Sequence, residues 1–398
     1  MDFKLLGSIL LVVGTAIGAG MLALPIATAQ LGFYSSLILL FVCWFIMTAG
    51  AFLLLEVNLW MPINSNLNTM ARDTIGPFGQ IISWLSFLLL LYSLLCAYIG
   101  GGSDLFHSLL AKANINIPQS FAAILFTFLF GSVVFMGMSS VDYVNRGLML
   151  IKFSAYFLLI FLLFPSVSQF NLASGDISKI PNTTAIMVTI TSFGYAAIVP
   201  SLRIYLQGDV KKLKQAIFIG SLIPLICYIA WNFAIMGVLP LNGEHGLEAI
   251  LNSDRSTSEL VSVLTIVASN SWIALIARLF TSICVLTSFL GVSLCLSDFW
   301  ADALQLEKKD KNNFIITFLT FLPPLIVVLF IPGIFVKAFE YAGICCLVLL
   351  VILPVWMAWK GRSKHRLLSQ FKVPGGVGLF IPLILFSLIM TGRMLFNW

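Results

Sequence analysis

The chain has 398 residues, of which 60% are hydrophobic and 10% charged, with a formal net charge of +6. A soluble domain carries about 25% charged residues, so this composition excludes a water-soluble globular protein and requires lipid as the surrounding solvent. Apolar runs recur along the whole length and predict a single transmembrane domain, residues 1–398. The seven cysteines lie inside these runs without metal-ligand spacing, so neither a metal site nor a cofactor is expected.

Turn and charge signals divide the apolar runs into eleven predicted membrane segments. The first run starts at Leu5 and contains Gly14, Gly18 and Pro25 instead of the Leu-rich core of a cleavable signal peptide, so we interpret it as a membrane helix. The segments are placed near residues 5–29, 33–60, 78–110, 119–138, 144–165, 183–206, 215–239, 271–300, 313–331, 333–357 and 376–396.

The basic residues predict the orientation of these segments. With a cytoplasmic N-terminus, most of the 22 Lys and Arg residues fall on the cytoplasmic side, as the positive-inside rule requires. The C-terminus is then periplasmic, and the net charge reports topology, not affinity for nucleic acid. The longest outer loop, residues 241–270, is expected to contain one or two short surface helices.

Two segments carry signals of an interrupted helix. Segment 1 has three glycines between Gly14 and Gly20, each costing a helix roughly 1 kcal/mol. Small residues at this spacing also suit close helix packing. Segment 6 shows a second interruption from Ser192 to Pro200. Both hold the same place in two five-segment halves, about 5–165 and 183–357, followed by an extra helix at 376–396. Matched interruptions in inverted repeats favour a transport site at mid-membrane.

The chemistry of such a site follows from helix ends. A half-helix that starts after Gly18 presents unpaired N–H groups and the positive end of its dipole, which attract a carboxylate. A half-helix ending near Gly14, and unwound carbonyls in segment 6, suit an ammonium group or a cation. A free amino acid carries both charges on one carbon and therefore matches this arrangement.

These motifs resemble one family throughout the first ten segments. The matching residues are Leu6–Ser8, Gly14–Met21, Leu24–Pro25, Leu53–Glu56, Ala97–Ile99, Ser192–Tyr195, Val199–Ser201, Thr287–Gly291 and Tyr341–Gly343. In order and content they resemble the bacterial hydroxy/aromatic amino acid permeases. The resemblance implies an all-α, leucine-transporter-like fold with a 5+5 inverted repeat, one extra C-terminal helix, discontinuous helices 1 and 6, and proton symport.

The resemblance also implies which residues meet the substrate. The substrate's amino-acid moiety should contact the residues of the first break, which are Thr15, Ala16, Gly18, Ala19 and Gly20. The facing wall should be formed by the residues of the second break, which are Ser192, Phe193, Gly194 and Tyr195. Two tyrosines of segment 3, Tyr92 and Tyr98, are candidate side walls, with an interfacial or core role as the alternative for Tyr92. The pair Ala196–Ala197 replaces the family's His-Gly, and Ser297 replaces an aromatic before Asp298, which leaves side-chain specificity open.

The coupling ion is predicted from residues near the first break. Sodium-coupled relatives of this fold place an Asn at the position of Met21, and a thioether is a poor ligand for a hard cation. A second sodium site of this fold uses hydroxyl groups, and Thr287 and Ser288 supply such groups here. Lys152 lies inside segment 5, where an ionisable residue is a functional hypothesis and snorkelling to the inner interface is the alternative. The favoured hypothesis places its ammonium beside Thr287 and Ser288 in place of sodium, where it exchanges protons.

Further charges in the spans are candidates for gates. Arg278 in segment 8 and Glu340 in segment 10 have similar depths from the outer side, which permits a salt bridge that closes the outer vestibule, or two independent polar contacts. Glu56, near the inner end of segment 2, could pair with Arg146 or Arg203, for which Asp298 and Asp142 compete. Such pairs would form an inner gate or, as we favour, satisfy charges at the interface.

Together these features predict a proton-coupled symporter that imports aromatic amino acids, tyrosine first, by alternating access. It is expected to work as a monomer in the bacterial inner membrane and to be no enzyme. The alternatives are a permease of the same fold for tryptophan, serine or threonine, and more remotely a membrane-embedded enzyme or a channel. An enzyme would need a cluster of His, Asp or Cys at one depth, and a channel a polar-lined path.

Overall fold

The computed structural model describes residues 2–268, 271–364 and 371–396, and the regular structure within these ranges is entirely helical. The longer helices and the parts of broken spans are α1 (Phe3–Ala16), α2 (Ala19–Ala27), α3 (Gly32–Trp60), α5 (Pro77–Lys112), α6 (Gln119–Phe135), α7 (Met138–Leu163), α9 (Thr183–Ser192), α10 (Val199–Tyr205), α11 (Val210–Val238), α14 (Ser271–Leu304), α15 (Asp310–Phe330), α16 (Ile334–Leu347), α17 (Leu353–Lys364) and α18 (Gly376–Phe396). The short connecting helices are α4 (Leu67–Thr74), α8 (Gln169–Ala173), α12 (Leu247–Leu251) and α13 (Ser256–Ala268).

Several of these helices have membrane length. Among the described residues, nine are long and apolar enough to cross a bilayer, and the bent pair α1–α2 makes a tenth if it forms one span. Helix α6 has 17 residues and is about 25 Å long, shorter than the roughly 30 Å hydrocarbon core. The structure therefore supports a polytopic, all-helical membrane protein, and the count of eleven spans stays a prediction.

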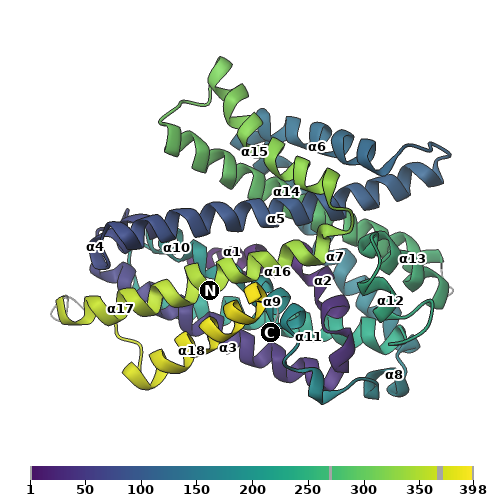
Figure 1. Ribbon diagram of the computed structural model, residues 1–398, viewed down its shortest axis with the longest axis horizontal. Helices are drawn as coiled ribbons and strands as arrows, with labels where there is room; N and C mark the ends of the chain where they lie inside the picture. Colours follow the sequence, from purple (N-terminus) through teal and green to yellow (C-terminus); the bar gives the residue numbers. More distant parts are fainter. Residues whose placement is uncertain (1, 269–270, 365–370, 397–398) are drawn as a thin grey trace.

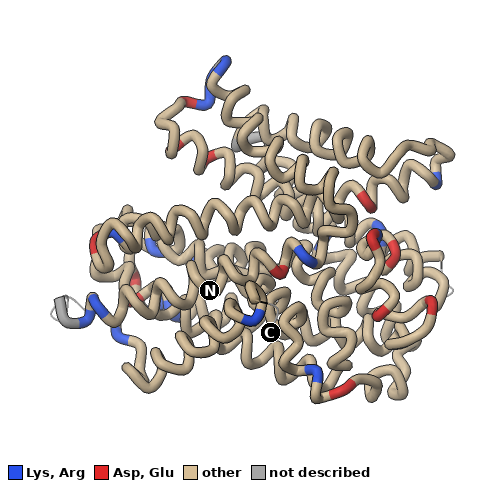
Figure 2. Tube along the Cα trace, in the orientation of Figure 1, with Lys and Arg blue, Asp and Glu red and all other residues tan. Residues whose placement is uncertain are grey.

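The helices run mostly along the long axis of the molecule. Helix α5 crosses the middle, with α6 and α15 on one side and α3, α11 and α18 on the other; α12 and α13 lie at one end, and α4 and α17 at the opposite end (Figure 1). Charged residues gather largely near these two ends (Figure 2). Phe128 on α6 and Leu150 and Phe161 on α7 leave at least 75% of their side chains exposed. Apolar exposure between charged ends is the pattern expected for lipid contact.

Element boundaries differ from the sequence-based prediction, for example at the end of α6 and at the end of the tenth segment, whereas one predicted link is confirmed. Helix α6 ends at Phe135 and not near 138, because Gly137 has a φ of +101°, a left-handed conformation that ends the helix. The link around Pro332 does separate two helices, since Gly333 has a φ of +69° and α16 starts after it. The tenth predicted segment is longer than expected. It continues from α16 through a π turn, η5 (Val348–Ile352), into α17.

The loop predicted at 241–270 contains two short helices, as expected, but α13 is not merely a surface helix. Leu260, Val261 and Leu264 on its inner face are at most 3% exposed, and α13 packs against α14 and α5. It therefore belongs to the folded core at that end of the molecule.

Charged side chains tie the end of the molecule that carries α4 and α17. Glu56 is fully buried on α3 and accepts two hydrogen bonds from Arg362 on α17, at 2.9 Å each, and one from the backbone N–H of Val373 at 2.7 Å. This corrects the predicted pairing of Glu56 with Arg146 or Arg203. Arg203 donates instead to the carbonyls of Asn58 and Met61 at the C-terminus of α3, where helix carbonyls lack donor partners within the helix.

The start of α1 is held by a more exposed ion pair. Asp2 precedes the helix and lies 2.8 Å from the ammonium of Lys212 in the first turn of α11. The Lys212 ammonium is the main cause that lowers the pKa of the Asp2 carboxyl below its usual value. Helices α1 and α11, which also pack along their length, are thus joined at this end.

Candidate functional site

The first break separates α1 from α2 at Ile17 and Gly18, where the two helices are bent by 51°. It is narrower than predicted, because Gly14 lies inside α1 and Gly20 inside α2. A Cβ atom on Gly18 would collide with the Ser288 hydroxyl of α14. Only glycine therefore lets the unwound backbone approach α14 this closely.

The second break lies where α9 ends, at Ser192. The chain continues through Phe193 into a 3₁₀ turn, η4 (Gly194–Ile198), before α10 begins at Val199 with Pro200 in its first turn. Proline at this position lacks an N–H that would be unpaired in any case, so it favours a new helix start there. The predicted interruption of the sixth segment is thus present.

The two breaks meet in space. A Cβ atom on Gly20 would lie 3.1 Å from the hydroxyl oxygen of Ser192. The hydroxyl of Tyr228, on α11, lies 2.7 Å from the carbonyl oxygen of Ala16 and 2.9 Å from that of Ser192. These carbonyls end α1 and α9, so one fully buried side chain joins the ends of both broken helices. Sequence reasoning missed Tyr228, whose only signal is a lone tyrosine in the middle of an apolar span.

Lys152 caps the C-terminal end of α1, at the first break. Its ammonium donates a 2.8 Å hydrogen bond to the carbonyl of Ile17, and the side chain is 1% exposed. Carbonyls at a helix C-terminus are unpaired and carry partial negative charge, which favours a cation there. The burial argues against the snorkelling alternative. Cys284 on α14 lies within electrostatic range of the ammonium.

The N-terminal end of α2, on the other side of the first break, has a different partner. The hydroxyl oxygen of Ser288 accepts a 3.0 Å hydrogen bond from the N–H of Ala19, the first residue of α2. Thr287 donates within its own helix to the carbonyl of Cys284, at 3.2 Å. In this structure Ser288 therefore caps the start of α2, while Lys152 caps the end of α1. These two predicted ion-coupling residues thus bind the two helix ends that face each other across the first break.

Aromatic side chains lie on one side of the junction between the two breaks. The Tyr98 ring, on α5, lies 6.0 Å from the ring of Phe339 on α16, and Tyr98 also interacts with Ser288. Phe339 is 1% exposed and would lie 3.5 Å from a Cβ on Gly20. The Phe193 ring packs edge-on against Tyr228 at 5.2 Å. Phe339 is a second residue that sequence reasoning missed.

Other predicted wall residues point elsewhere. The Tyr92 hydroxyl donates to the carbonyl of Leu319 at 2.7 Å and accepts from the indole of Trp300 at 3.0 Å, so it ties α5 to α14 and α15. The Tyr195 hydroxyl lies 2.8 Å from that of Thr48 on α3. The Tyr92 contact joins helices outside the two breaks, whereas the Tyr195 contact ties the second break to α3.

The smaller site residues divide by exposure. Ala16 and Ala19 are buried, whereas Thr15 is exposed and returns its hydroxyl to the carbonyl of Leu11 at 2.8 Å. Gly194 packs against the sulfur of Cys346, which would lie 3.4 Å from a Cβ there. Within the described part of the chain, no group of three or more His, Cys, Asp or Glu is placed to hold a metal ion.

The predicted gate pair is not formed in this structure. Arg278 lines a small cavity with residues of α5 and α13, whereas Glu340 interacts with Thr184 on α9 and with Lys337. The ion pairs between described residues do not include one between Arg278 and Glu340. Their predicted role as a gate therefore stays a prediction.

Comparison with known proteins decides which solute class such a site serves. A model of the tryptophan/tyrosine permease family matches residues 1–394. The chain belongs to this family. The permease is 37% identical to tyrosine-specific transport system 1 of Haemophilus influenzae, over 97% of its own length and 95% of that protein. It is 34% identical to glutamine transporter 2 of Aliivibrio fischeri (98% and 99%) and 32% identical to a tryptophan-specific transport protein of H. influenzae (97% and 94%). The permease is thus a multi-pass amino-acid transport protein and not an enzyme.

Proposed function

We propose that the permease is a proton-coupled symporter that imports aromatic amino acids, tyrosine first, across the bacterial inner membrane by alternating access. The observation that carries this proposal is the Lys152 ammonium on the Ile17 carbonyl, at the point where a broken helix meets a second one. Relatives named as tyrosine-specific transport systems, 37% and 34% identical over nearly the whole chain, support tyrosine as the first substrate.

The substrate would bind where the two breaks meet. The first N–H groups of α2 suit its carboxylate, and the carbonyls that end α1 and α9 suit its ammonium. Tyr98 and Phe339 supply ring faces for an aromatic side chain, which prefers offset or edge-to-face contact. The backbone frame recognises any amino acid, so the rings carry the preference for aromatic ones.

The proton would act through Lys152. As an ammonium, it makes a charge-assisted hydrogen bond to Ile17, and such bonds are roughly twice as strong as neutral ones. Loss of the proton weakens that bond and frees the end of α1 to move relative to α7. Met21, fully buried one turn into α2, offers a thioether where a sodium site would need oxygen ligands, which supports the proton over sodium.

The proposed architecture has eleven spans, with α1–α2 as the first and α9–α10 as the sixth, related as corresponding members of a leucine-transporter-like 5+5 inverted repeat. Helix α18 is the extra span. The N-terminus is cytoplasmic and the C-terminus periplasmic, and the working unit is a monomer. Interrupted helices at corresponding positions support this arrangement.

The test is uptake of labelled tyrosine into proteoliposomes under an imposed inward proton gradient. We expect accumulation that a protonophore abolishes, and competition by phenylalanine and tryptophan but not by serine or threonine. The glutamine-transporting relative makes glutamine a required competitor. Displacement by glutamine alone would replace the aromatic assignment.

A lysine variant tests the coupling step separately. Lys152→Ala should keep tyrosine exchange but lose proton-driven accumulation, while Lys179→Ala, at an exposed loop position, should keep both. Accumulation by Lys152→Ala equal to that of the parent would exclude the proton role of Lys152 and leave the substrate assignment intact.

A further inference from the structure

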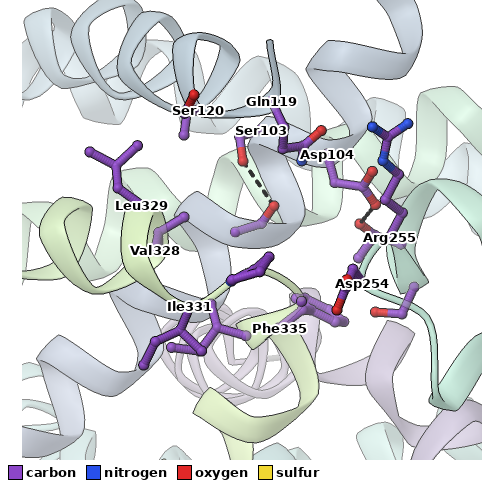
Figure 3. A pocket seen from close by; sticks show the side chains of 17 residues that line it. Ser103, Asp104, Gln119, Ser120, Asp254, Arg255, Val328, Leu329, Ile331 and Phe335 are labelled. Atoms are coloured by element: carbon purple, nitrogen blue, oxygen red, sulfur yellow. Dashed lines mark hydrogen bonds between the residues drawn. The ribbon is translucent and has the colours of Figure 1, made fainter.

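A buried carboxylate holds the start of helix α13 from a neighbouring helix. Asp104, on α5 (Figure 3), is 3% exposed and accepts three hydrogen bonds: 2.6 Å from the Thr257 hydroxyl, 2.7 Å from the Ser258 N–H and 2.6 Å from the Ser258 hydroxyl. Helix α13 begins at Ser256. An acidic group at a helix N-terminus pairs with its free N–H groups and with its dipole, so Asp104 caps α13 from outside its own segment.

The same contact continues toward the site through two aromatic rings. Thr257 also donates to the carbonyl of Gly101 at 3.2 Å, and a Cβ on Gly101 would lie 2.7 Å from the Phe335 ring and 3.1 Å from the Thr257 methyl. The Phe335 ring lies 5.3 Å from that of Phe339, which in turn packs on Gly20. The Phe335 ring, in the first turn of α16, therefore packs closely on Gly101 of α5, beside Thr257 of α13.

Free volume lies directly beside this contact. A cavity of about 370 Å³ is lined by Ser103 and Asp104 of α5, Gln119 of α6, the segment 254–257 and the link between α15 and α16 (Figure 3). Arg255, at its rim, interacts favourably with the Asp104 carboxylate. The cavity gives the start of α13 and the α15–α16 link a place to move once the capping bonds break.

We propose that Asp104 is a positioning residue for transport. Its bonds to α13, which we call the Asp104 latch, keep the outer side of the site closed and must break before that side opens. Phe339 packs on the junction of the two breaks and Phe335 packs on Phe339, and the start of α16 would be unable to leave α5 while α13 is latched beside it. The side that the latch closes is the outer one in the proposed topology. The latch itself depends on neither the substrate nor the coupling ion.

The test measures access to a buried reporter beneath the latch. Ala338, which precedes Phe339 on α16 and is 2% exposed, is replaced by cysteine, and intact cells are treated with a membrane-impermeant maleimide, with the parent protein as background. In this reporter, Asp104→Asn should label about tenfold faster, the effect expected from losing one charge-assisted hydrogen bond. Asp104→Glu should restore slow labelling at least in part.

Transport kinetics separate this positioning role from a folding defect. Asp104→Asn should lower the maximal uptake rate several-fold and change KM little, because the closed outer state is lost while the binding groups stay. Ser258→Ala, which keeps the buried carboxylate, should speed labelling about threefold. Thr265→Val is the matched control: its hydroxyl bonds only within α13, to Val261 at 2.7 Å, so labelling and uptake should stay as in the parent.

Two results would overturn the proposal. The first is parent-like labelling in both Asp104→Asn and Ser258→Ala when both variants are present in the membrane at parent levels. The second is faster labelling by Thr265→Val equal to that of Asp104→Asn. Faster labelling seen only in inside-out vesicles would instead overturn the proposed topology, and with it the outer assignment of the latch.

Discussion

Replacing Tyr228 by phenylalanine removes one oxygen atom from the point where the two breaks meet and leaves the ring against Phe193. That oxygen lies 2.7 and 2.9 Å from the carbonyls of Ala16 and Ser192, and the side chain is fully buried. Leaving a buried acceptor without its donor costs about 1–3 kcal/mol, which is a factor of about 5–150 in an equilibrium constant. We expect substrate affinity to rise within that range, because both carbonyls belong to the proposed ammonium site and the substrate ammonium would satisfy the acceptor that Tyr228→Phe leaves unpaired.

A second tyrosine provides a matched control. Tyr156, on α7, is 3% exposed and donates a 2.9 Å hydrogen bond to the carbonyl of Cys227, on the same helix as Tyr228 but away from the breaks. Tyr156→Phe should lower the melting temperature of the purified permease as much as Tyr228→Phe does, yet leave tyrosine affinity unchanged. Binding of labelled tyrosine to detergent-solubilised protein measures affinity directly. Equal affinity of the parent and Tyr228→Phe would refute the reasoning and leave Tyr228 a structural residue.

Two further predictions test the break between α1 and α2 and the ion pair between Glu56 and Arg362. Gly18→Ala should reduce uptake more than tenfold because its methyl group meets the Ser288 hydroxyl, and the double variant with Ser288→Ala should recover part of the loss; no recovery would exclude this collision as the cause. Glu56→Gln should destabilise the fold by about 3–5 kcal/mol, the usual effect of removing one partner of a buried ion pair, here Arg362. Asp298→Asn, in an ion pair whose Asp298 side chain is 59% exposed, should change the melting temperature little.

The sequence was informative wherever a residue type has one dominant physical meaning. Glycines in an apolar span and a proline after a polar-aromatic stretch predicted both breaks, because each residue weakens a helix locally. The lysine inside segment 5 predicted a cation buried in the protein for a similar reason, since lipid leaves a charge few places to lie, and Lys152 is buried; its role in transport stays a prediction. These inferences need no knowledge of which helices are neighbours.

Pairings were predicted less well, because they depend on rotation and depth of whole helices. Tyr92 and Tyr98 are six residues apart, about 9 Å along α5, yet Tyr92 contacts α14 and α15 while Tyr98 reaches the junction. Several basic residues were predicted at a membrane depth similar to that of Glu56. Arg362 forms the pair because α17 packs against α3. Tyr228 gave no signal, since a single tyrosine in a span is as common in cores as in sites.

The arrangement at the first break suggests how substrate and proton would be linked. Helices α7 and α14 pack together and hold opposite ends of the break, the Lys152 ammonium on the carbonyl of Ile17 and the Ser288 hydroxyl on the N–H of Ala19. A bound amino acid brings the same two kinds of group, an ammonium for the carbonyl end of α1 and a carboxylate for the N–H end of α2. Lys152 holds the carbonyl of Ile17, whereas the proposed ammonium site uses the neighbouring carbonyl of Ala16. A protonated Lys152 would keep the end of α1 in place and so favour substrate binding, and by linkage substrate binding would favour protonation of Lys152 to the same extent. In the proposed symport, coupling would then need no path between distant sites, because both ligands act on one break in one helix.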